Sequence, residues 1–202
     1  MVHINRGMTA GRPCEFDPRQ ALESATRVFW ERGYQAASLE DLLTAMDLNK
    51  SSFYQAFGSK PALFQRCLEN YRDASTDRLR AQLDQATSGW EFLQAVFQGV
   101  AENTQAPMGR AGCLLINTAS EFAQRDPKIS ALVARSLERI EDIFYAAVCR
   151  AQAEGKITKG ANARSLAAFL TANLGGLKGL ARAGTSPEKM HTIVQVILNG
   201  LK

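Results

Sequence analysis

Polar side chains gather at the start of one short segment of the chain. After Asn49 come Lys50, Ser51, Ser52, Tyr54 and Gln55. Together they present a cation, hydroxyls and an amide, groups that hydrogen-bond to phosphates and to the edges of bases. Phe53 and Phe57 stand four positions apart, so on a helix capped by Asn49 they share the opposite, inward face. The segment therefore predicts a short helix whose outer face suits nucleic acid, although a merely solvated polar face would look the same.

A second short helix is predicted just before this one. Ser38 and Asp41 stand three positions apart, as in a capping box, and an apolar stripe follows up to Met46. Two short helices joined by a turn form a helix-turn-helix, in which the second helix lies in the major groove of DNA and the first braces it. Similar helix pairs also occur in α-helical proteins that bind no DNA, so the pattern alone leaves both interpretations open.

The rest of the chain is predicted to be helical as well. One helix opens at Asp17-Pro18 and stops at Gly33, and a long one begins near Lys60 and ends by Gly89. Further helices are expected over about 90–104, 112–122 and 126–154, with a break at 106–109, and two more close the chain. No alternating strand pattern competes with these. The expected fold class is all-α, with about nine helices.

Composition limits the class of protein. The chain has 202 residues, of which 46% are apolar and 22% charged, as is usual for globular proteins. It has no signal peptide at its start and no apolar run near the roughly 18 residues of a membrane span, so we expect a cytoplasmic protein. The four cysteines are far apart and the two histidines lack acidic partners, so no metal site, other cofactor or disulfide is expected. The net charge of +4 permits nucleic-acid binding, but residues 1–60 sum to about zero.

Two longer runs resemble one family of regulators. The runs VFWERGYQAAS (residues 28–38) and SSFYQAFGSKPALF (residues 51–64) resemble the N-terminal domain of TetR-family transcriptional regulators, and the similarity extends over residues 11–71. The resemblance implies a three-helix DNA-binding domain over residues 1–60 and a helical effector-binding and dimerisation domain over residues 61–202. It also implies a homodimer that holds double-stranded operator DNA as a repressor and is released by a small-molecule effector.

The resemblance also implies roles for single residues. Ser38 matches a phosphate-contacting position at the start of the second helix, and Lys50, Ser51 and Ser52 match groove-facing positions. Tyr54 and Lys60 match positions that contact the DNA backbone. Gln55 joins this set from its expected place on the outer surface of the same helix.

Two further features of the N-terminal region bear on DNA binding. Asp47 stands in the turn, where the family commonly has glycine; Asp tolerates a left-handed backbone better than most residues, so a strained turn is compatible with this residue. Arg6 and Arg12 are candidates for an arm that reaches the minor groove, although a basic terminus is more often simply unstructured.

One cysteine lies in a second motif. The segment AGCLLINTASEF (residues 111–122) resembles a GCL-x-x-N-x-x-x-E pattern found in a subset of these regulators, some of which sense electrophiles or oxidants through its cysteine, here Cys113. A sensor thiol needs solvent access and stabilisation of the thiolate, whereas the apolar residues after Cys113 are typical of a buried core thiol. Noncovalent binding of an apolar molecule between the C-terminal helices is the favoured alternative, with Trp90, Phe97, Phe122 and Phe144 as bulky candidates that ordinary core packing also explains.

The last two expected helices are rich in small and apolar residues, as a dimer interface or an internal core would be. We expect effector binding to favour a dimer whose recognition helices are wrongly spaced for DNA, with the long fourth helix as the lever. An enzyme is disfavoured, because no set of nucleophile and base, Gly-rich phosphate loop or metal cluster is present. A helical protein-interaction module that keeps the fold without specific DNA binding remains the alternative.

Overall fold

A computed structural model describes residues 16–122 and 126–202, and the secondary structure of these residues is helical. The helices are α1 (Pro18–Arg32), α2 (Leu39–Met46), α3 (Lys50–Phe57), α4 (Lys60–Gln85), α5 (Gly89–Glu102), α6 (Pro107–Arg110), α7 (Leu114–Phe122), α8 (Pro127–Ala153), α9 (Ala163–Arg182) and α10 (Pro187–Asn199). The predicted all-α class is confirmed. Arg6 and Arg12 lie outside the described residues.

Side-chain caps set the helix starts where the sequence predicted them. Asp17, Ser38, Asn49, Ser59 and Asp126 each accept a hydrogen bond from a backbone N–H in the first turn of the helix that follows. These bonds satisfy N–H groups that have no partner within the helix itself.

The structure differs from the sequence prediction at 106–109, where a break was expected and a single helical turn, α6, is found. Pro107 fits the first turn of a helix, which the prediction overlooked. No side chain caps this turn, and Gly112, at φ 76°, ends the segment soon after it. Gly109 packs so closely that an added Cβ would lie 1.8 Å from the carbonyl oxygen of Asn103.

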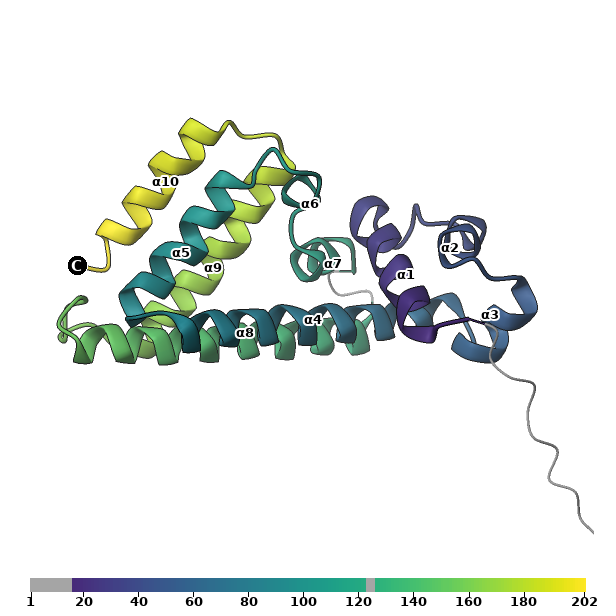
Figure 1. The fold of residues 1–202 in the computed structure, drawn as a ribbon, viewed down its shortest axis with the longest axis horizontal. Helices are drawn as coiled ribbons and strands as arrows, with labels where there is room; N and C mark the ends of the chain where they lie inside the picture. The colour runs from purple at the N-terminus through teal and green to yellow at the C-terminus, as the bar shows by residue number, and fades with distance from the viewer. Residues whose placement is uncertain (1–15, 123–125) are drawn as a thin grey trace, which may run out of the picture.

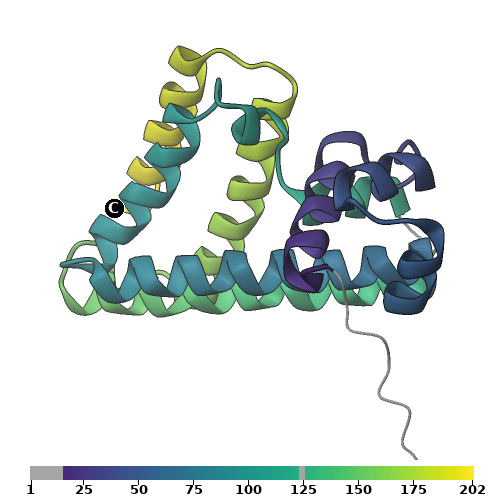
Figure 2. The same cartoon turned by 45° about the vertical axis from the view of Figure 1, so that its right-hand side comes forward.

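The helices form a small head and a larger body, joined by α4 (Figure 1). Helices α1, α2 and α3 make the head. The first turns of α4 pack against α1 and α3. From there α4 runs the length of the body alongside α8. Helix α5 rises from the far end of this pair, and α9 packs on α8 and, in the turned view, stands nearer the middle of the pair (Figure 2). Helix α10 packs on the outside of α5.

One continuous set of buried apolar residues runs through both parts. In the head, the ring of Phe64 from α4 lies 4.9 Å from that of Phe29 and 4.8 Å from that of Tyr34. In the body, Phe144 of α8 packs against Phe92 and Phe97 of α5. Because α4 contributes to both ends of this core, the head cannot shift far without disturbing the packing of the body.

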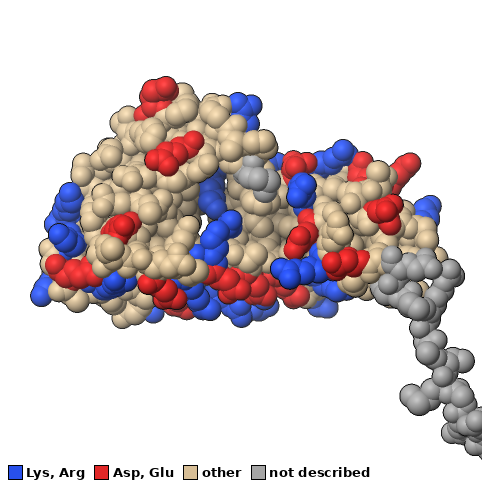
Figure 3. Space-filling model, viewed as in Figure 1, with Lys and Arg blue, Asp and Glu red and all other residues tan. Residues whose placement is uncertain are grey.

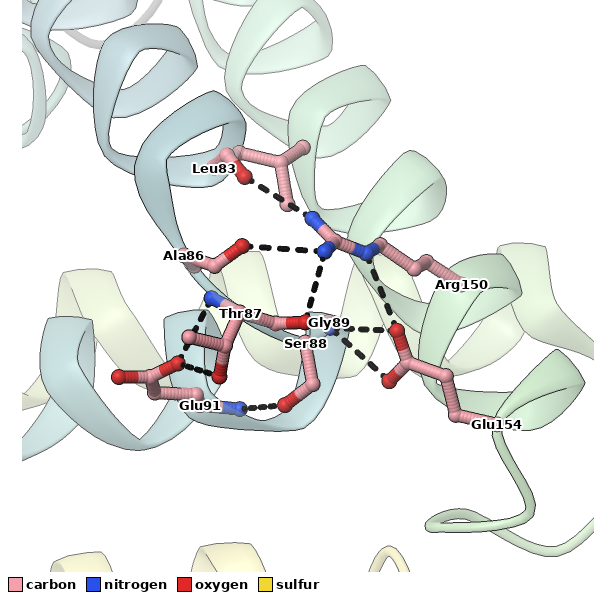
Figure 4. A network of polar contacts seen from close by, with 8 residues as sticks. All are labelled: Leu83, Ala86, Thr87, Ser88, Gly89, Glu91, Arg150 and Glu154. Carbon is pink, nitrogen blue, oxygen red and sulfur yellow. Dashed lines mark hydrogen bonds and ion pairs between the residues drawn. The ribbon is translucent and has the colours of Figure 1, made fainter.

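Arg150 of α8 fixes the corner between α4 and α5 (Figure 4). Its guanidinium donates hydrogen bonds of 3.1, 3.0 and 2.9 Å to the carbonyl oxygens of Leu83, Ala86 and Thr87. It also pairs at 3.0 Å with Glu154, whose carboxylate accepts from the backbone N–H of Gly89 at the start of α5. These bonds supply partners for backbone carbonyl groups at the end of α4 and for a backbone N–H at the start of α5. They therefore help to determine where α4 stops.

Candidate functional site

The turn between α2 and α3 has the geometry of a helix-turn-helix. Ser38 and Asp41 form a full capping box: the Ser38 Oγ accepts from the Asp41 N–H at 3.0 Å, and the Asp41 carboxylate accepts from the Ser38 N–H at 3.0 Å. Hydrogen bonds from Ser38 hold the pKa of Asp41 below its usual value. After α2, Asp47 adopts the left-handed conformation at φ 52°, as the sequence predicted for this position.

Helix α3 has one buried and one exposed face. Phe53 and Phe57 are buried, whereas Tyr54 is 52% exposed. The other predicted DNA contacts on this helix are Lys50, Ser51 and Gln55, which are exposed, and Ser52, which is half-buried. The inward phenylalanines that the sequence predicted are confirmed, and they fix which side of the helix reaches solvent.

Two predicted contacts lie outside α3. Ser38 is exposed at the start of α2, and its hydroxyl also donates to Asp41 at 2.7 Å. Lys60, the first residue of α4, is half-buried, with its ammonium 4.4 Å from the centre of the Tyr34 ring. Burial lowers the pKa of Lys60, and the charge of Glu121 partly opposes this shift.

Helix α7 of the body binds the head directly. Its Glu121 carboxylate accepts hydrogen bonds from the backbone N–H groups of Tyr34, at 2.9 Å, and Gln35, at 2.6 Å. The next residue, Phe122, packs on Tyr34 and stacks on Phe64. Glu121 is the last residue of the GCL-x-x-N-x-x-x-E pattern, and sequence reasoning assigned it no role although the motif could have pointed to it.

The other end of that motif lines a cavity. A space of about 340 Å³ lies between α4, α5, α8 and α9, and Cys113 is part of its wall together with Trp30 and Tyr71. Cys113 is buried, with the Tyr71 hydroxyl donating to its sulfur at 3.7 Å. Burial and the neighbouring thiol raise the pKa of Tyr71. The four aromatic residues that the sequence offered as cavity candidates do not line it: Phe97 and Phe144 pack in the core, and Phe122 packs against the head.

Family comparison identifies both parts of the chain. Residues 21–67 match the family described as bacterial regulatory proteins, tetR family, and residues 89–197 match the description tetracyclin repressor-like, C-terminal domain. The chain belongs to the TetR family. The first match falls on α1 to the start of α4, and the second runs from α5 into α10.

Relatives of this TetR-family protein span nearly its whole length. It is 31% identical to the HTH-type transcriptional repressor ComR of Escherichia coli (strain K12), over 93% of this chain and 90% of ComR. It is 28% identical to the HTH-type transcriptional regulator YezE of Bacillus subtilis (strain 168), over 95% of this chain and 99% of YezE. Our TetR-family chain is therefore a DNA-binding transcriptional regulator.

Solved TetR-family structures share the fold. The regulator CifR, solved as a cysteine mutant with 26-bp double-stranded operator DNA, aligns with a TM-score of 0.81 and 29% identity, covering 95% of this chain and all of CifR. The reduced form of E. coli NemR also gives a TM-score of 0.81, at 20% identity over 90% of this chain and 94% of NemR. In the part of the chain that the structure describes, no helix is long and apolar enough to cross a membrane.

Proposed function

We propose that this TetR-family protein binds double-stranded operator DNA as a homodimer, with α3 in the major groove, and represses transcription. The observation that carries the proposal is the division of α3 between a buried apolar face and an exposed polar one. Lys50, Ser51, Ser52, Tyr54 and Gln55 supply its groove and backbone contacts, and Ser38 and Lys60 add contacts to phosphates. The similarity to ComR, a transcriptional repressor, supports repression over activation.

We assign DNA binding and effector binding to different parts of the chain. The DNA-binding domain comprises residues 1–60, including the N-terminal arm, and residues 61–202 bind the effector and the second subunit. The role is regulatory and not enzymatic, and its place is the cytoplasm, where the target DNA lies.

The dimer forms through α9 and α10. In the described part of the chain the large apolar side chains that remain exposed are Tyr54, Tyr145, Phe169, Leu180 and Val196, and the last three of these lie on α9 and α10. Exposed apolar side chains that cluster on adjoining helices mark an interaction surface. A two-fold dimer presents two copies of α3 to successive major grooves of a pseudo-palindromic operator.

An effector in the body cavity releases the DNA. Trp30 of α1 lines the cavity, and α7 runs from the cavity at Cys113 to the head at Glu121, so both helices connect the ligand site to the DNA-binding helices. Ligand binding favours a dimer with wrongly spaced recognition helices, a population shift in which α4 is the lever. A thiol-reactive effector would act at Cys113, the candidate sensor thiol in the same wall.

A titration of fluorescently labelled DNA tests the proposal. The wild type is titrated against the intergenic DNA beside its own gene and against a scrambled duplex, at two salt concentrations, with Tyr54→Ala and, as a matched exposed tyrosine on α8, Tyr145→Ala. We expect sequence-selective binding that weakens with salt and that Tyr54→Ala, but not Tyr145→Ala, reduces by about tenfold or more. Equally weak binding to both duplexes, unaffected by Tyr54→Ala, would contradict the proposal and favour a protein-interaction module.

A further inference from the structure

The wall of the body cavity combines apolar surface with positive charge. Much of the lining is apolar, including Trp30, Leu79 and Ile140. Arg78 of α4 and Lys178 of α9 also line it, whereas no Asp or Glu does among the residues that the structure describes. The charge at the ligand site is therefore of one sign.

Among the residues that the structure describes, neither cation has a partner. Among residues 16–122 and 126–202, the ion pairs involve other arginines, and neither Arg78 nor Lys178 donates a side-chain hydrogen bond. Arg182, one turn after Lys178, differs: it donates to the carbonyl oxygens of Trp30 and Ala111 at 3.3 and 2.9 Å. Figure 3 shows Lys and Arg side chains bordering the hollow above α4.

We propose that the effector is an amphipathic organic anion, such as a carboxylate or sulfonate on an apolar body, whose charged group binds between Arg78 and Lys178. An uncharged ligand would cover the half-buried Lys178 without giving it a partner, at a cost in desolvation. An anion forms charge-assisted hydrogen bonds with both cations, while its apolar part covers Trp30 and Ile140. A volume of about 340 Å³ falls in the range of small-molecule sites.

The regulatory meaning of this site rests on the proposed function, because the ligand is proposed to act by releasing DNA. The binding chemistry does not rest on it, and a test that contains no DNA separates the two.

The test uses two fluorescent probes of similar shape that differ in charge. Anilinonaphthalene sulfonate is an anion, and phenylnaphthylamine is its uncharged counterpart. Both are titrated into the wild type, Arg78→Met and Lys178→Met. The control variants Arg80→Met on α4 and Lys189→Met on α10 remove exposed cations that do not line the cavity. Thermal melts show that each variant is folded before it is titrated.

We expect the anionic probe to bind at one site per chain, and each cavity variant to raise its Kd by about five- to tenfold. The Kd of the uncharged probe should stay within about twofold in these variants, and the controls should leave both probes unaffected. Methionine keeps the apolar stem, so the difference between probes isolates the charge.

The proposal is overturned if the wild type does not bind the anion, if the cavity variants weaken both probes equally or neither, or if the control variants have the same effect. Anion binding of the expected kind in a protein that fails the operator titration would leave this site standing and refute the proposed function. Selective operator binding without charge-dependent probe binding would support the proposed function and refute the anion site.

Discussion

Two buried thiols of this protein have different surroundings, and the difference sets what each can do. Cys67 is fully enclosed where α4 packs on α1, and burial raises its pKa to about 12, against smaller opposing effects of Thr26 and Arg66. Cys113 is also buried but lines the body cavity beside Tyr71. A reagent that enters the cavity meets Cys113, which lines it, and not Cys67, which does not. Cys67 is also held as a thiol, whereas the thiolate is the reactive form.

The raised pKa of Cys67 predicts that the folded chain loses stability at alkaline pH. The folded chain holds this proton to about pH 12, whereas an unfolded thiol loses it near its ordinary value of 9.0. The free energy of unfolding is therefore unaffected by Cys67 below pH 9 and falls between pH 9 and about 12. Between pH 8 and pH 10 we expect Cys67 alone to lower it by about 1.4 kcal/mol, measured by urea unfolding.

Cys67→Ala provides the control for this prediction, since it removes the titrating group from the same site. We expect the variant to be less stable than the wild type at pH 8, but its free energy of unfolding should fall by about 1.4 kcal/mol less than that of the wild type over this interval. Tyr71, whose pKa burial also raises, begins to contribute only near pH 10 and above. Parallel curves for the two proteins would show that Cys67 does not titrate differently in the folded chain.

At the scale of the helix, α7 connects the cavity to the head, and Glu121 makes the connection. Its carboxylate accepts two backbone N–H groups that follow the end of α1. Glu121→Gln removes the charge while keeping the shape, and hydrogen bonds to charged groups are the stronger kind. We expect amide hydrogen exchange at Tyr34 and Gln35 to accelerate by about tenfold.

The amide of Asp41, held by the capping box, should exchange at an unchanged rate in Glu121→Gln and serves as the internal reference. Glu102→Gln, an exposed site at the end of α5, is the matched charge control. If Tyr34 and Gln35 exchange no faster than in the wild type, Glu121 does not fix the head to α7.

Arg150 of α8 holds the corner between α4 and α5, as Glu121 holds the head to α7. Arg150→Met leaves three carbonyl oxygens and the Glu154 carboxylate without this partner (Figure 4). Partial exposure lets water replace some of these bonds, so we expect a loss of about 1–3 kcal/mol. In a calorimetric melt this corresponds to a Tm lower by about 3–10 °C for a chain of this size.

Arg135→Met on the same helix removes an exposed arginine and should change the free energy of unfolding by no more than about 0.5 kcal/mol. Equal melting curves for Arg150→Met and Arg135→Met would mean that water hydrogen-bonds to the carbonyl oxygens at this corner as well as Arg150 does.

The helices were predictable because their signals are local. Caps such as Asn49 and Asp126, prolines in first turns and the inward Phe53 each act within about one helical turn, which a single sequence records. The bond from Glu121 to Tyr34 joins residues 87 apart in the chain, and Arg150 reaches the α4–α5 corner across more than 60. Hydrophobic periodicity carries no information on such distant pairs, and it likewise could not show that Arg78 and Lys178 line one cavity.

At the scale of the molecule, DNA recognition depends on a second copy of the chain. On α9, Phe169, Gly176 and Leu180 follow one another at intervals of seven and four residues, which places them on one face of the helix. Phe169 and Leu180 are exposed, and a Cβ added at Gly176 would meet nothing within 4 Å. Packing within a single chain therefore gives no reason for glycine at position 176, whereas the close approach of a partner helix does.

Gly176→Leu separates these two cases. In the isolated chain the substitution fills open space and improves helix propensity, so the protomer should be at least as stable, by up to about 1 kcal/mol. Across a close helix contact it inserts a side chain into a filled interface, and overpacking of that kind costs about 1–3 kcal/mol per copy. Because both subunits carry the change, we expect the dimer dissociation constant to rise by about 100-fold, measured by sedimentation, and operator affinity to fall with it. Ala134→Leu, an exposed site on α8, should leave the dimer intact; a Gly176→Leu dimer as tight as that control would place the interface elsewhere on the body.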